Sequence, residues 1–387
     1  MIEFPHDCKR LIALALLLAL AGCREQCECP CESGTSGTSA TLIAAQNPRD
    51  ALSRAGSAFT PDAFVAAAGK GAVSLVNLFL TAGMAVDARA ASDNTAMMWA
   101  AAQGRLDVLK ILLNSKADVN AKSADRTTAL LNAAEGGSLD CARELVAHGA
   151  DIQARRKDGR TALMAAAIEG HAALVVYLLD CGANPKQADA QGLTPLMYAA
   201  ANIRDEDTSE RTLAAVKVLI DRGADVNAKA ADGTTALMRA AKKGEAPIVA
   251  LLLEHGADIA ARDNDEKTAL IYACLLKAPP PAAKALLKAG ANVSAQDKSG
   301  STALMYAARK LLPGVLKALL EKDKSSLDAQ DKEGRTALHH AVLKSRPKNV
   351  ALLLASGADR KMKDANGQTA LELAEKMQDA GLLQALK

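Results

Sequence analysis

Aromatic side chains are scarce in this chain of 387 residues, at 2% of the total: one tryptophan, four tyrosines and four phenylalanines. An ordinary globular core draws much of its buried area from aromatic rings. The scarcity therefore favours a core of small and aliphatic side chains. A charge excess is also lacking, because 47 basic residues offset 44 acidic ones and leave a net charge of +3. So small a net positive charge, with no stripe of basic residues in the sequence, argues against nucleic acid as a partner.

Motifs for catalysis are lacking as well. Gly69-Lys70-Gly71 has neither the spacing nor the following hydroxyl of a phosphate-binding loop. His339 and His340 are neighbours, and the other four histidines, at positions 6, 148, 171 and 255, are scattered without the spacing of a zinc-binding helix. No nucleophile, base and orienting acid fall into a common register. We therefore expect no enzyme activity, no catalytic or metal-binding residues, no cofactor and no small-molecule substrate.

The chain has in abundance one short phrase, Thr-Ala-Leu-Met and its variants. Nine copies begin at Thr95, Thr128, Thr161, Thr194, Thr235, Thr268, Thr302, Thr336 and Thr369. Successive copies are 33, 33, 33, 41, 33, 34, 34 and 33 residues apart. A fixed period in this range is typical of stacked units, each too small to bury its own apolar face.

Each phrase predicts the start of a helix. The residue two positions after the threonine is apolar in all nine copies, and the residue five positions after it is alanine in all nine. These two positions share one helical face, and the threonine suits the cap that precedes a helix. A second apolar segment follows and ends at a Gly-Ala pair such as Gly149-Ala150 or Gly256-Ala257, where glycine suits a left-handed helix terminus. A polar turn then leads to the next threonine.

These residues resemble the ankyrin repeat, whose pattern is G-x-T-P-L-H-x-A-A, a second helix, and then L-L-x-x-G-A-D-V-N-A. Asp118-Val119-Asn120-Ala121 and Asp225-Val226-Asn227-Ala228 match its tail. The resemblance implies an all-α solenoid of stacked helix-turn-helix units with short projecting hairpin loops. We assign it to residues 58–387, about ten repeats including a degenerate N-terminal cap from Thr60 and a truncated C-terminal cap. The step of 41 residues reflects a polar insertion around 202–212, which is either a tolerated bulge or a contact.

The N-terminus predicts export and lipid attachment. Lys9-Arg10 leads into the apolar run Leu11–Ala21, which is too short to span a bilayer and matches a signal peptide. The run ends in Leu20-Ala21-Gly22-Cys23, which resembles the bacterial lipobox. The resemblance implies a signal peptide over residues 1–22 and an acylated Cys23 that anchors the protein to a lipid bilayer. Arg24 after the acylated residue favours an outer-membrane lipoprotein of the cell envelope, facing the periplasm.

Residues 23–57 are expected to form a flexible tether rich in Cys, Ser, Gly and Thr. Cys27, Cys29 and Cys31 form a C-x-C-x-C motif, which allows disulfides or a soft metal ion but lacks a second ligand pair. Cys141 and Cys274 have the register of small core residues, whereas Cys181, just before a glycine, is expected to be exposed.

One row of residues is the best candidate for a binding surface. The positions four after each threonine are occupied by Trp99, Asn132, Ala165, Tyr198, Arg239, Tyr272, Tyr306, His340 and Leu373. Four of the few aromatic residues fall in this single row, and aromatic residues and arginine carry most binding energy at interfaces. In the ankyrin pattern this position borders the concave groove. The row either contacts a partner, through Trp99, Tyr198, Arg239, Tyr272, Tyr306 and His340, or fills gaps between adjacent helices.

Charged residues at the loop tips form a second candidate surface: Lys157, Arg160, Lys298, Lys332 and Arg335. Together with the row they would outline the face on which ankyrin repeats generally hold another protein. The sequence thus predicts a membrane-anchored protein-binding scaffold of the bacterial envelope. The alternatives are an intracellular adaptor or secreted effector without a lipid anchor, and a redox or metal-handling envelope protein that uses Cys27, Cys29 and Cys31.

Overall fold

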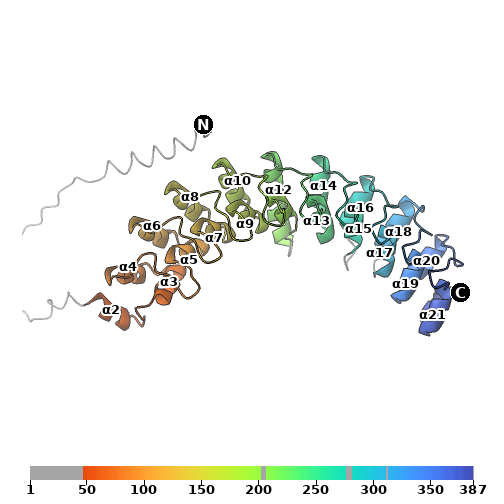
Figure 1. Cartoon of the computed structure of the whole chain (residues 1–387), viewed down its shortest axis with the longest axis horizontal. Coiled ribbons are helices and arrows are strands. Elements are labelled where there is room, and N and C mark those ends of the chain that lie inside the picture. Colours follow the sequence, from red (N-terminus) through yellow and green to blue (C-terminus); the bar gives the residue numbers. More distant parts are fainter. Residues whose placement is uncertain (1–46, 202–205, 276–280, 311–312, 387) are drawn as a thin grey trace, which may run out of the picture. The chain divides into compact units, whose positions relative to one another are not determined.

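The computed structural model describes residues 47–201, 206–275, 281–310 and 313–386, and within these ranges the chain is all-helical. The only β-type pairings among them are three isolated bridges, of which Arg89 with Thr95 is one. The signal peptide, Cys23 and the C-x-C-x-C motif lie outside the described residues. The all-α solenoid with projecting loops is confirmed (Figure 1).

Helices come in pairs, one pair to each repeat. The first helices are α3 (Pro61–Lys70), α5 (Ala96–Ala102), α7 (Ala129–Glu135), α9 (Ala162–Ile168), α11 (Pro195–Ala201), α13 (Ala236–Lys243), α15 (Ala269–Cys274), α17 (Ala303–Arg309), α19 (Ala337–Leu343) and α21 (Ala370–Met377). The second helices are α4 (Val73–Thr81), α6 (Leu106–Asn114), α8 (Leu139–Ala147), α10 (Ala172–Asp180), α12 (Glu206–Asp221), α14 (Ala246–Glu254), α16 (Pro281–Lys288), α18 (Pro313–Lys322), α20 (Pro347–Ala355) and α22 (Ala380–Leu386). From α3 to α7 and from α11 to α21 each first helix packs on the next first helix, and from α4 to α8 and from α12 to α22 each second helix packs on the next second helix.

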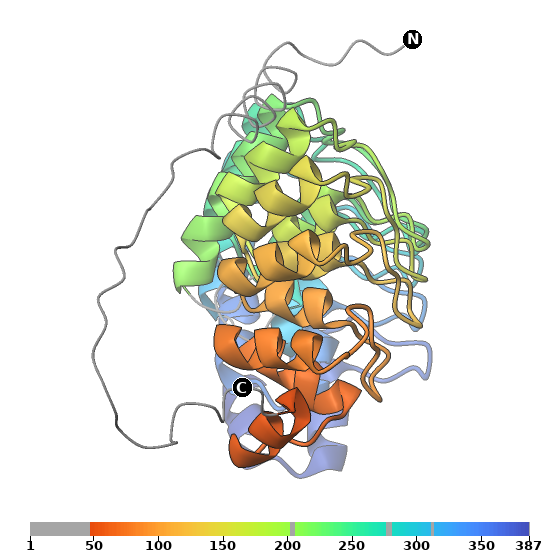
Figure 2. The ribbon, with the colours of Figure 1, turned by 90° about the vertical axis from the view of Figure 1, so that its left-hand side faces the viewer.

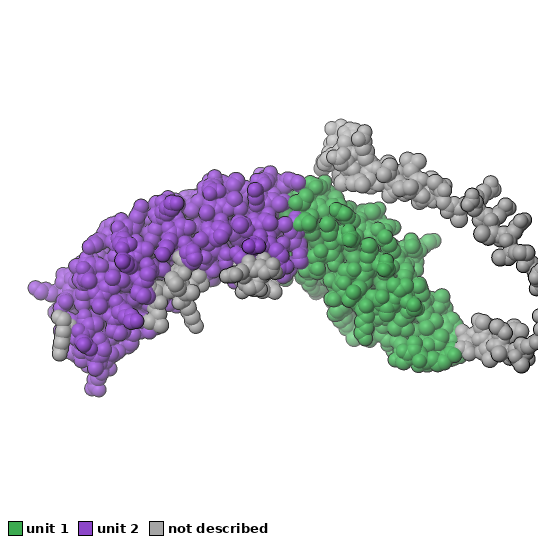
Figure 3. All heavy atoms as spheres, turned by 180° about the vertical axis from the view of Figure 1, so that it is seen from behind, with its two compact units in different colours: residues 1–166, 173–184 green, residues 167–172, 185–387 purple. Residues whose placement is uncertain are grey.

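Two compact units divide the array: residues 1–166 with 173–184, and residues 167–172 with 185–387 (Figure 3). Each unit has the same two layers of helices. Within the second unit, the first helices lie on the inner side of the bend in the ribbon (Figure 1). Within each unit the loops between successive repeats project to one side of the layers (Figure 2).

The repeated threonines begin the first helices as the sequence predicts. The Thr268 hydroxyl, for example, accepts a hydrogen bond from the backbone N–H of Ile271 at 3.4 Å. All nine alanines five positions later are completely buried, because neighbouring first helices approach closely there. The start of the helix after Thr336 has an additional contact through His339. The backbone N–H of Thr336 donates to Nδ1 of His339 at 3.2 Å, and Nε2 of His339 donates to the carbonyl of Gln368. His339 thereby joins the start of its own helix to the loop that precedes Thr369.

Glycine provides the left-handed turns after most second helices, as at Gly149 and Gly256, where φ is +87° and +81°. Lys116 replaces glycine at the equivalent position and keeps the same conformation, with φ at +64°. One glycine is required for a different reason. A Cβ atom on Gly136 would lie 2.0 Å from the backbone oxygen of Ala102, so only hydrogen fits between these two repeats.

The ordered array begins earlier than the sequence predicts. Residues 48–54, assigned to the flexible tether, form helix α2 (Pro48–Arg54), capped by the Asn47 side chain and packed on α4. Leu52 is completely buried, and the Arg49 guanidinium lies 4.4 Å from the centre of the Phe59 ring. The prediction of a flexible segment is therefore wrong for residues 48–54, since α2 occupies the place of a second helix preceding α4.

Two further expectations change. Cys181 is only 9% exposed, so its predicted exposure is wrong, whereas Cys141 and Cys274 are buried as expected. The insertion near residue 202 does not form a loop throughout. It lengthens α12 to 16 residues, against nine in α10 and α14, and the Ser209 hydroxyl donates to Glu245 of the next repeat at 2.7 Å.

Candidate binding surface

The row four residues after each threonine lies on the first helices and is only partly covered. Trp99 is 43% exposed, and the rings of Tyr198, Tyr272 and Tyr306 are half-buried. Asn132, Arg239 and Leu373 are also half-buried, whereas Ala165 and His340 are buried. The tyrosine and tryptophan rings are thus not enclosed between repeats, and each keeps a face that a partner can reach.

Each tyrosine of the row is held by an aspartate nine residues upstream, in the hairpin that precedes its helix. The hydroxyls of Tyr198, Tyr272 and Tyr306 donate to Asp189, Asp263 and Asp297 across 2.6, 2.7 and 2.7 Å. These aspartates are buried. Each also accepts hydrogen bonds from backbone N–H groups of its own loop, for example those of Ser299 and Ser301 at Asp297. The tyrosines therefore join the first helices to the hairpin loops.

Burial and these hydrogen bonds shift the ionisation of both partners. Burial, and then the hydrogen bond to Asp263, raise the pKa of Tyr272, and the same causes with Asp297 raise the pKa of Tyr306. Burial alone would raise the pKa of Asp297, but hydrogen bonds from Ser299, Tyr306 and Ser301 outweigh it and lower the pKa. The tyrosines stay neutral donors and Asp297 stays a charged acceptor near neutral pH.

His340 occupies the position of Tyr306 one repeat later, but it is not part of the accessible surface. Its side chain is buried, and Nε2 lies 2.6 Å from Oδ2 of Asp331 and 2.9 Å from the Arg309 guanidinium. Burial and then the positive charge of Arg309 lower the pKa of His340 to about 4, against the opposing effect of Asp331. His340 was predicted to contact a partner, but its buried side chain can act only by positioning Asp331 and Arg309.

Arg239 follows the same principle with a different partner. Its hairpin has Ala230 where the hairpins before the three tyrosines have the buried aspartate, and the guanidinium instead lies 3.5 Å from Asp232 and donates to Thr234 at 2.9 Å. The arginine reaches farther than tyrosine, so its acceptor lies two residues later in the loop. Arg239 thus joins helix to hairpin and keeps part of its guanidinium exposed.

Trp99 lies between two hollows in the first unit. One, of about 420 Å³, is lined by Val65, Gly69 and Ala90 among others. The other, of about 480 Å³, is lined by Asn132 and Arg156 among others. A Cβ on Gly69 would lie 3.4 Å from Cε3 of Trp99, so the glycine leaves room for the indole against α3. The position nine residues before Trp99 is Ala90, which offers no acceptor that would tie the ring down.

The predicted loop-tip residues differ in exposure. Lys157, Lys298 and Lys332 are exposed, and their backbone N–H groups donate to carbonyls of the preceding hairpin, those of Asp125, Asp265 and Ser299. Arg160 and Arg335 are half-buried. The Arg160 guanidinium pairs with Asp158 of its own loop at 2.6 Å. The three lysines are therefore the tip residues most available to a partner, on backbone that is fixed to the neighbouring loop.

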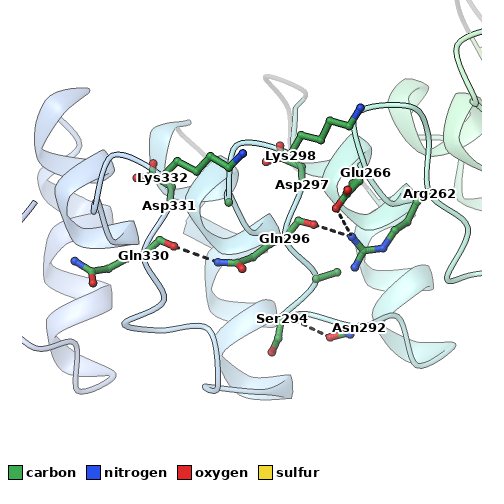
Figure 4. A pocket seen from close by; sticks show the side chains of 12 residues that line it. Arg262, Glu266, Asn292, Ser294, Gln296, Asp297, Lys298, Gln330, Asp331 and Lys332 are labelled. Atoms are coloured by element: carbon green, nitrogen blue, oxygen red, sulfur yellow. Dashed lines mark hydrogen bonds and ion pairs between the residues drawn. The ribbon is translucent and has the colours of Figure 1, made fainter. Parts of the chain in front are cut away.

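A second set of contacts ties the hairpins together. Along part of the array, the side chain six residues before the threonine reaches the carbonyl of the same position in the next repeat: Arg262 donates to Gln296, and Gln296 donates to Gln330 (Figure 4). Gln330 continues the series to Lys363. These residues line an open cavity of about 590 Å³, and Lys298 and Lys332 also line it. The hairpins thus form a connected polar surface.

The described part of the chain holds no cluster of three or more histidine, cysteine or acidic side chains that could bind a metal ion. Burial raises the pKa of the Cys141 thiol to about 11 and that of Cys274 to about 12, so neither is a thiolate at neutral pH.

None of the helices in the described ranges has the length and apolar character that crossing a membrane requires.

The buried aspartates are the residues that sequence reasoning missed. They precede the threonine by five positions in five repeats, at Asp189, Asp263, Asp297, Asp331 and Asp364. Four of these five repeats carry tyrosine or histidine nine residues after the aspartate, and the repeats without the aspartate carry none. This pairing within each repeat is a sequence signal that a comparison of the two columns would have found.

Comparison with known proteins agrees with the geometry. A family described as ankyrin repeats (3 copies) matches in overlapping segments over residues 13–123, 63–156, 130–211, 207–297, 277–364 and 314–386. The ankyrin repeat domain of human ASB11 is similar in structure, with a TM-score of 0.51 and 26% sequence identity over 58% of this chain and 96% of that chain. No curated protein matches the chain. Arrays of this kind are protein-binding scaffolds, and no catalytic family is indicated. The chain belongs to the ankyrin repeat family.

Proposed function

We propose that this protein is a binding scaffold of the bacterial cell envelope, held to the membrane by a lipid on Cys23. The inner row of first helices and the exposed tips of the hairpins bind another protein. The anchor is supported by the order of basic residues, short apolar run and Leu20-Ala21-Gly22-Cys23. Outer-membrane placement facing the periplasm is supported by Arg24 after the acylated cysteine.

The observation that carries the binding role is the preorganised row of tyrosines. Tyr272 and Tyr306 lie on successive first helices, keep an accessible face, and have their hydroxyls fixed at 2.7 Å from buried carboxylates. A side chain that is already held loses little conformational entropy when a partner binds. Mere gap-filling between helices does not account for rings that remain accessible.

The binding role is tested by crosslinking in the native host. Tyr272→Ala combined with Tyr306→Ala should weaken partner capture more than tenfold while helicity falls only slightly. Tyr177→Ala is the matched control, since Tyr177 lies on the second helix α10. If the double variant unfolds the array, or captures the same proteins as the control, the row belongs to the core and has no binding role.

The anchor requires a separate experiment. Metabolic palmitate labelling should mark the wild-type chain and fail on Cys23→Ser. Equal labelling of both would favour an intracellular adaptor or secreted effector instead. A triple variant with serine in place of Cys27, Cys29 and Cys31 should still capture the partner. Loss of partner capture in this variant would favour the redox or metal-handling alternative.

A further inference from the structure

Charge is distributed unevenly among the first helices. Helices α5, α7, α9 and α11 carry no lysine or arginine, and their only charged residue is Glu135. Helices α13, α15, α17 and α19 carry no acidic residue, and their charged side chains are Arg239, Lys242, Lys243 and Arg309. The charged side chains on α13 and α17 are therefore all cationic, whereas α21, at the end of the array, carries Glu372 and Glu375.

These cations share a face with the tyrosine row. Residues three and four positions apart lie on the same side of a helix, so Lys242 and Lys243 follow Arg239 on α13, while Arg309 and Lys310 follow Tyr306 at the end of α17. The Lys242 ammonium lies 5.8 Å from the centre of the Tyr272 ring, and the Arg309 guanidinium 4.9 Å from that of Tyr306. We call Lys242, Lys243, Tyr272, Tyr306, Arg309 and Lys310 the basic tyrosine strip.

The cations at the α13 end of the strip are available for a ligand, whereas Arg309 at the other end also lies 3.8 Å from buried Asp331. Lys242 and Lys243 are exposed, and neither has a carboxylate within ion-pair distance among the described residues. The acids nearest the rings, Asp263 and Asp297, are buried behind them and occupied by the tyrosine hydroxyls. A ligand that lies over the rings of Tyr272 and Tyr306 therefore meets aromatic faces and, on the α13 side, ammonium groups, while the carboxylates exposed nearby lie in the hairpins beside the strip.

We propose that the basic tyrosine strip binds an extended, acidic segment of a protein partner. Neighbouring helices pack about 8–10 Å apart, so the cations of α13 and α17, two repeats apart, are separated by about 16–20 Å. An extended chain advances about 3.3 Å per residue. Two acidic positions about five or six residues apart, with an apolar side chain between them over Tyr272, match this spacing. The inference rests on the proposed binding role and specifies the chemistry of the partner.

A protein segment fits the strip better than a nucleic acid does. The hairpins beside the strip expose carboxylates at Asp232, Asp265 and Glu266. A phosphate backbone carries charge at short, regular intervals, and its phosphates would face these groups. A peptide with two separated acidic positions avoids them.

The test uses the full chain and a fluorescein-labelled peptide with two glutamate pairs about six residues apart and a phenylalanine between them. Fluorescence anisotropy should show binding that weakens as salt rises, since exposed charges are screened. A peptide with glutamine in place of each glutamate should bind at least tenfold more weakly. Lys242→Glu with Lys243→Glu should weaken binding of the acidic peptide at least tenfold.

The matched control is Lys284→Glu with Lys288→Glu, which makes the same charge change on the second helix α16, where both lysines are exposed. Equal losses in the two variants, equal binding of the glutamine peptide, or tighter binding of an oligothymidylate of equal charge would each overturn the inference. If partner capture by crosslinking in the host still depended on Tyr272, the proposed binding role would stand, and only the acidic nature of the partner segment would be wrong. Circular dichroism of each variant checks that the helices are intact.

Discussion

Tyr306 and Asp297 connect a first helix to the hairpin before it, through a hydroxyl that donates to a buried carboxylate across 2.7 Å. The same bond recurs one repeat earlier between Tyr272 and Asp263. The residue that offers an aromatic face to a partner is thus also a structural tie. Substitutions must separate these two roles before a binding defect is assigned to the ring.

Tyr306→Phe removes the hydroxyl and keeps the ring. We expect it to destabilise the repeat by about 1–2 kcal/mol, because buried Asp297 loses one of its donors. Partner capture should remain near wild type. A double-mutant cycle with Asp297→Ala in urea unfolding measures the coupling. Additive losses would show that the hydroxyl and the carboxylate are not coupled, and lost capture would show that the bond itself is needed for binding.

Gly136→Ala and Gly149→Ala separate close packing from backbone strain. A Cβ on Gly136 would lie 2.0 Å from the Ala102 oxygen, so the first substitution should destabilise the array by about 3 kcal/mol through overpacking. Gly149 has φ at +87° and open space around it, so the second should cost only about 1 kcal/mol. Urea midpoints of the two variants give the comparison, and the reverse order would contradict it.

Thr268→Ala removes the cap of α15. The free N–H of Ile271 should raise local unfolding, at a cost of about 1 kcal/mol, and Thr268→Ser should restore most of it. Hydrogen exchange of the segment that contains α15 is the suitable measurement, because repeat arrays open locally. Unchanged exchange in the alanine variant would mean that the cap is dispensable.

Because His340 is buried, we expect the free energy of unfolding to fall in acid. Its pKa is about 4 in the folded chain against 6.5 for the free side chain, so the unfolded chain binds the proton first as pH falls. The stabilising contribution is complete above about pH 6.5 and is lost between about pH 6.5 and 4, which amounts to about 2 kcal/mol between pH 7.5 and 5. His340→Gln should remove this component, and His255→Gln, at an exposed histidine, should not. Urea unfolding at both pH values decides, and identical pH dependence in the two variants would refute the assignment.

Trp99 is the only tryptophan and is 43% exposed, so it reports on its surroundings directly. Acrylamide should quench the fluorescence of the free protein efficiently. A partner that covers the hollows beside Trp99 should protect it and shift emission to shorter wavelength. Trp99→Phe gives the background signal. Emission from the free protein that resists quenching would place the indole in the core.

The periodicity in the sequence determined the fold, because each repeat has to supply its own cap, apolar face and turn, and these are local requirements. The threonine caps, the buried alanines and the left-handed glycines all follow from short-range chemistry that recurs every 33 or 34 residues. The sequence likewise placed Trp99, Tyr198, Tyr272 and Tyr306 on the first helices. It could not assign a depth to each, since tyrosine and histidine suit the same position equally well.

Contacts between segments decided the rest. His340 is buried because Asp331 and Arg309 meet it from two different repeats, and α2 is ordered because Leu52 finds a buried place beside α4. Gly136 is required because the carbonyl of Ala102 approaches from the preceding repeat. Local patterns specify which groups a helix offers, whereas burial and pairing depend on what the neighbouring repeat brings within a few ångströms.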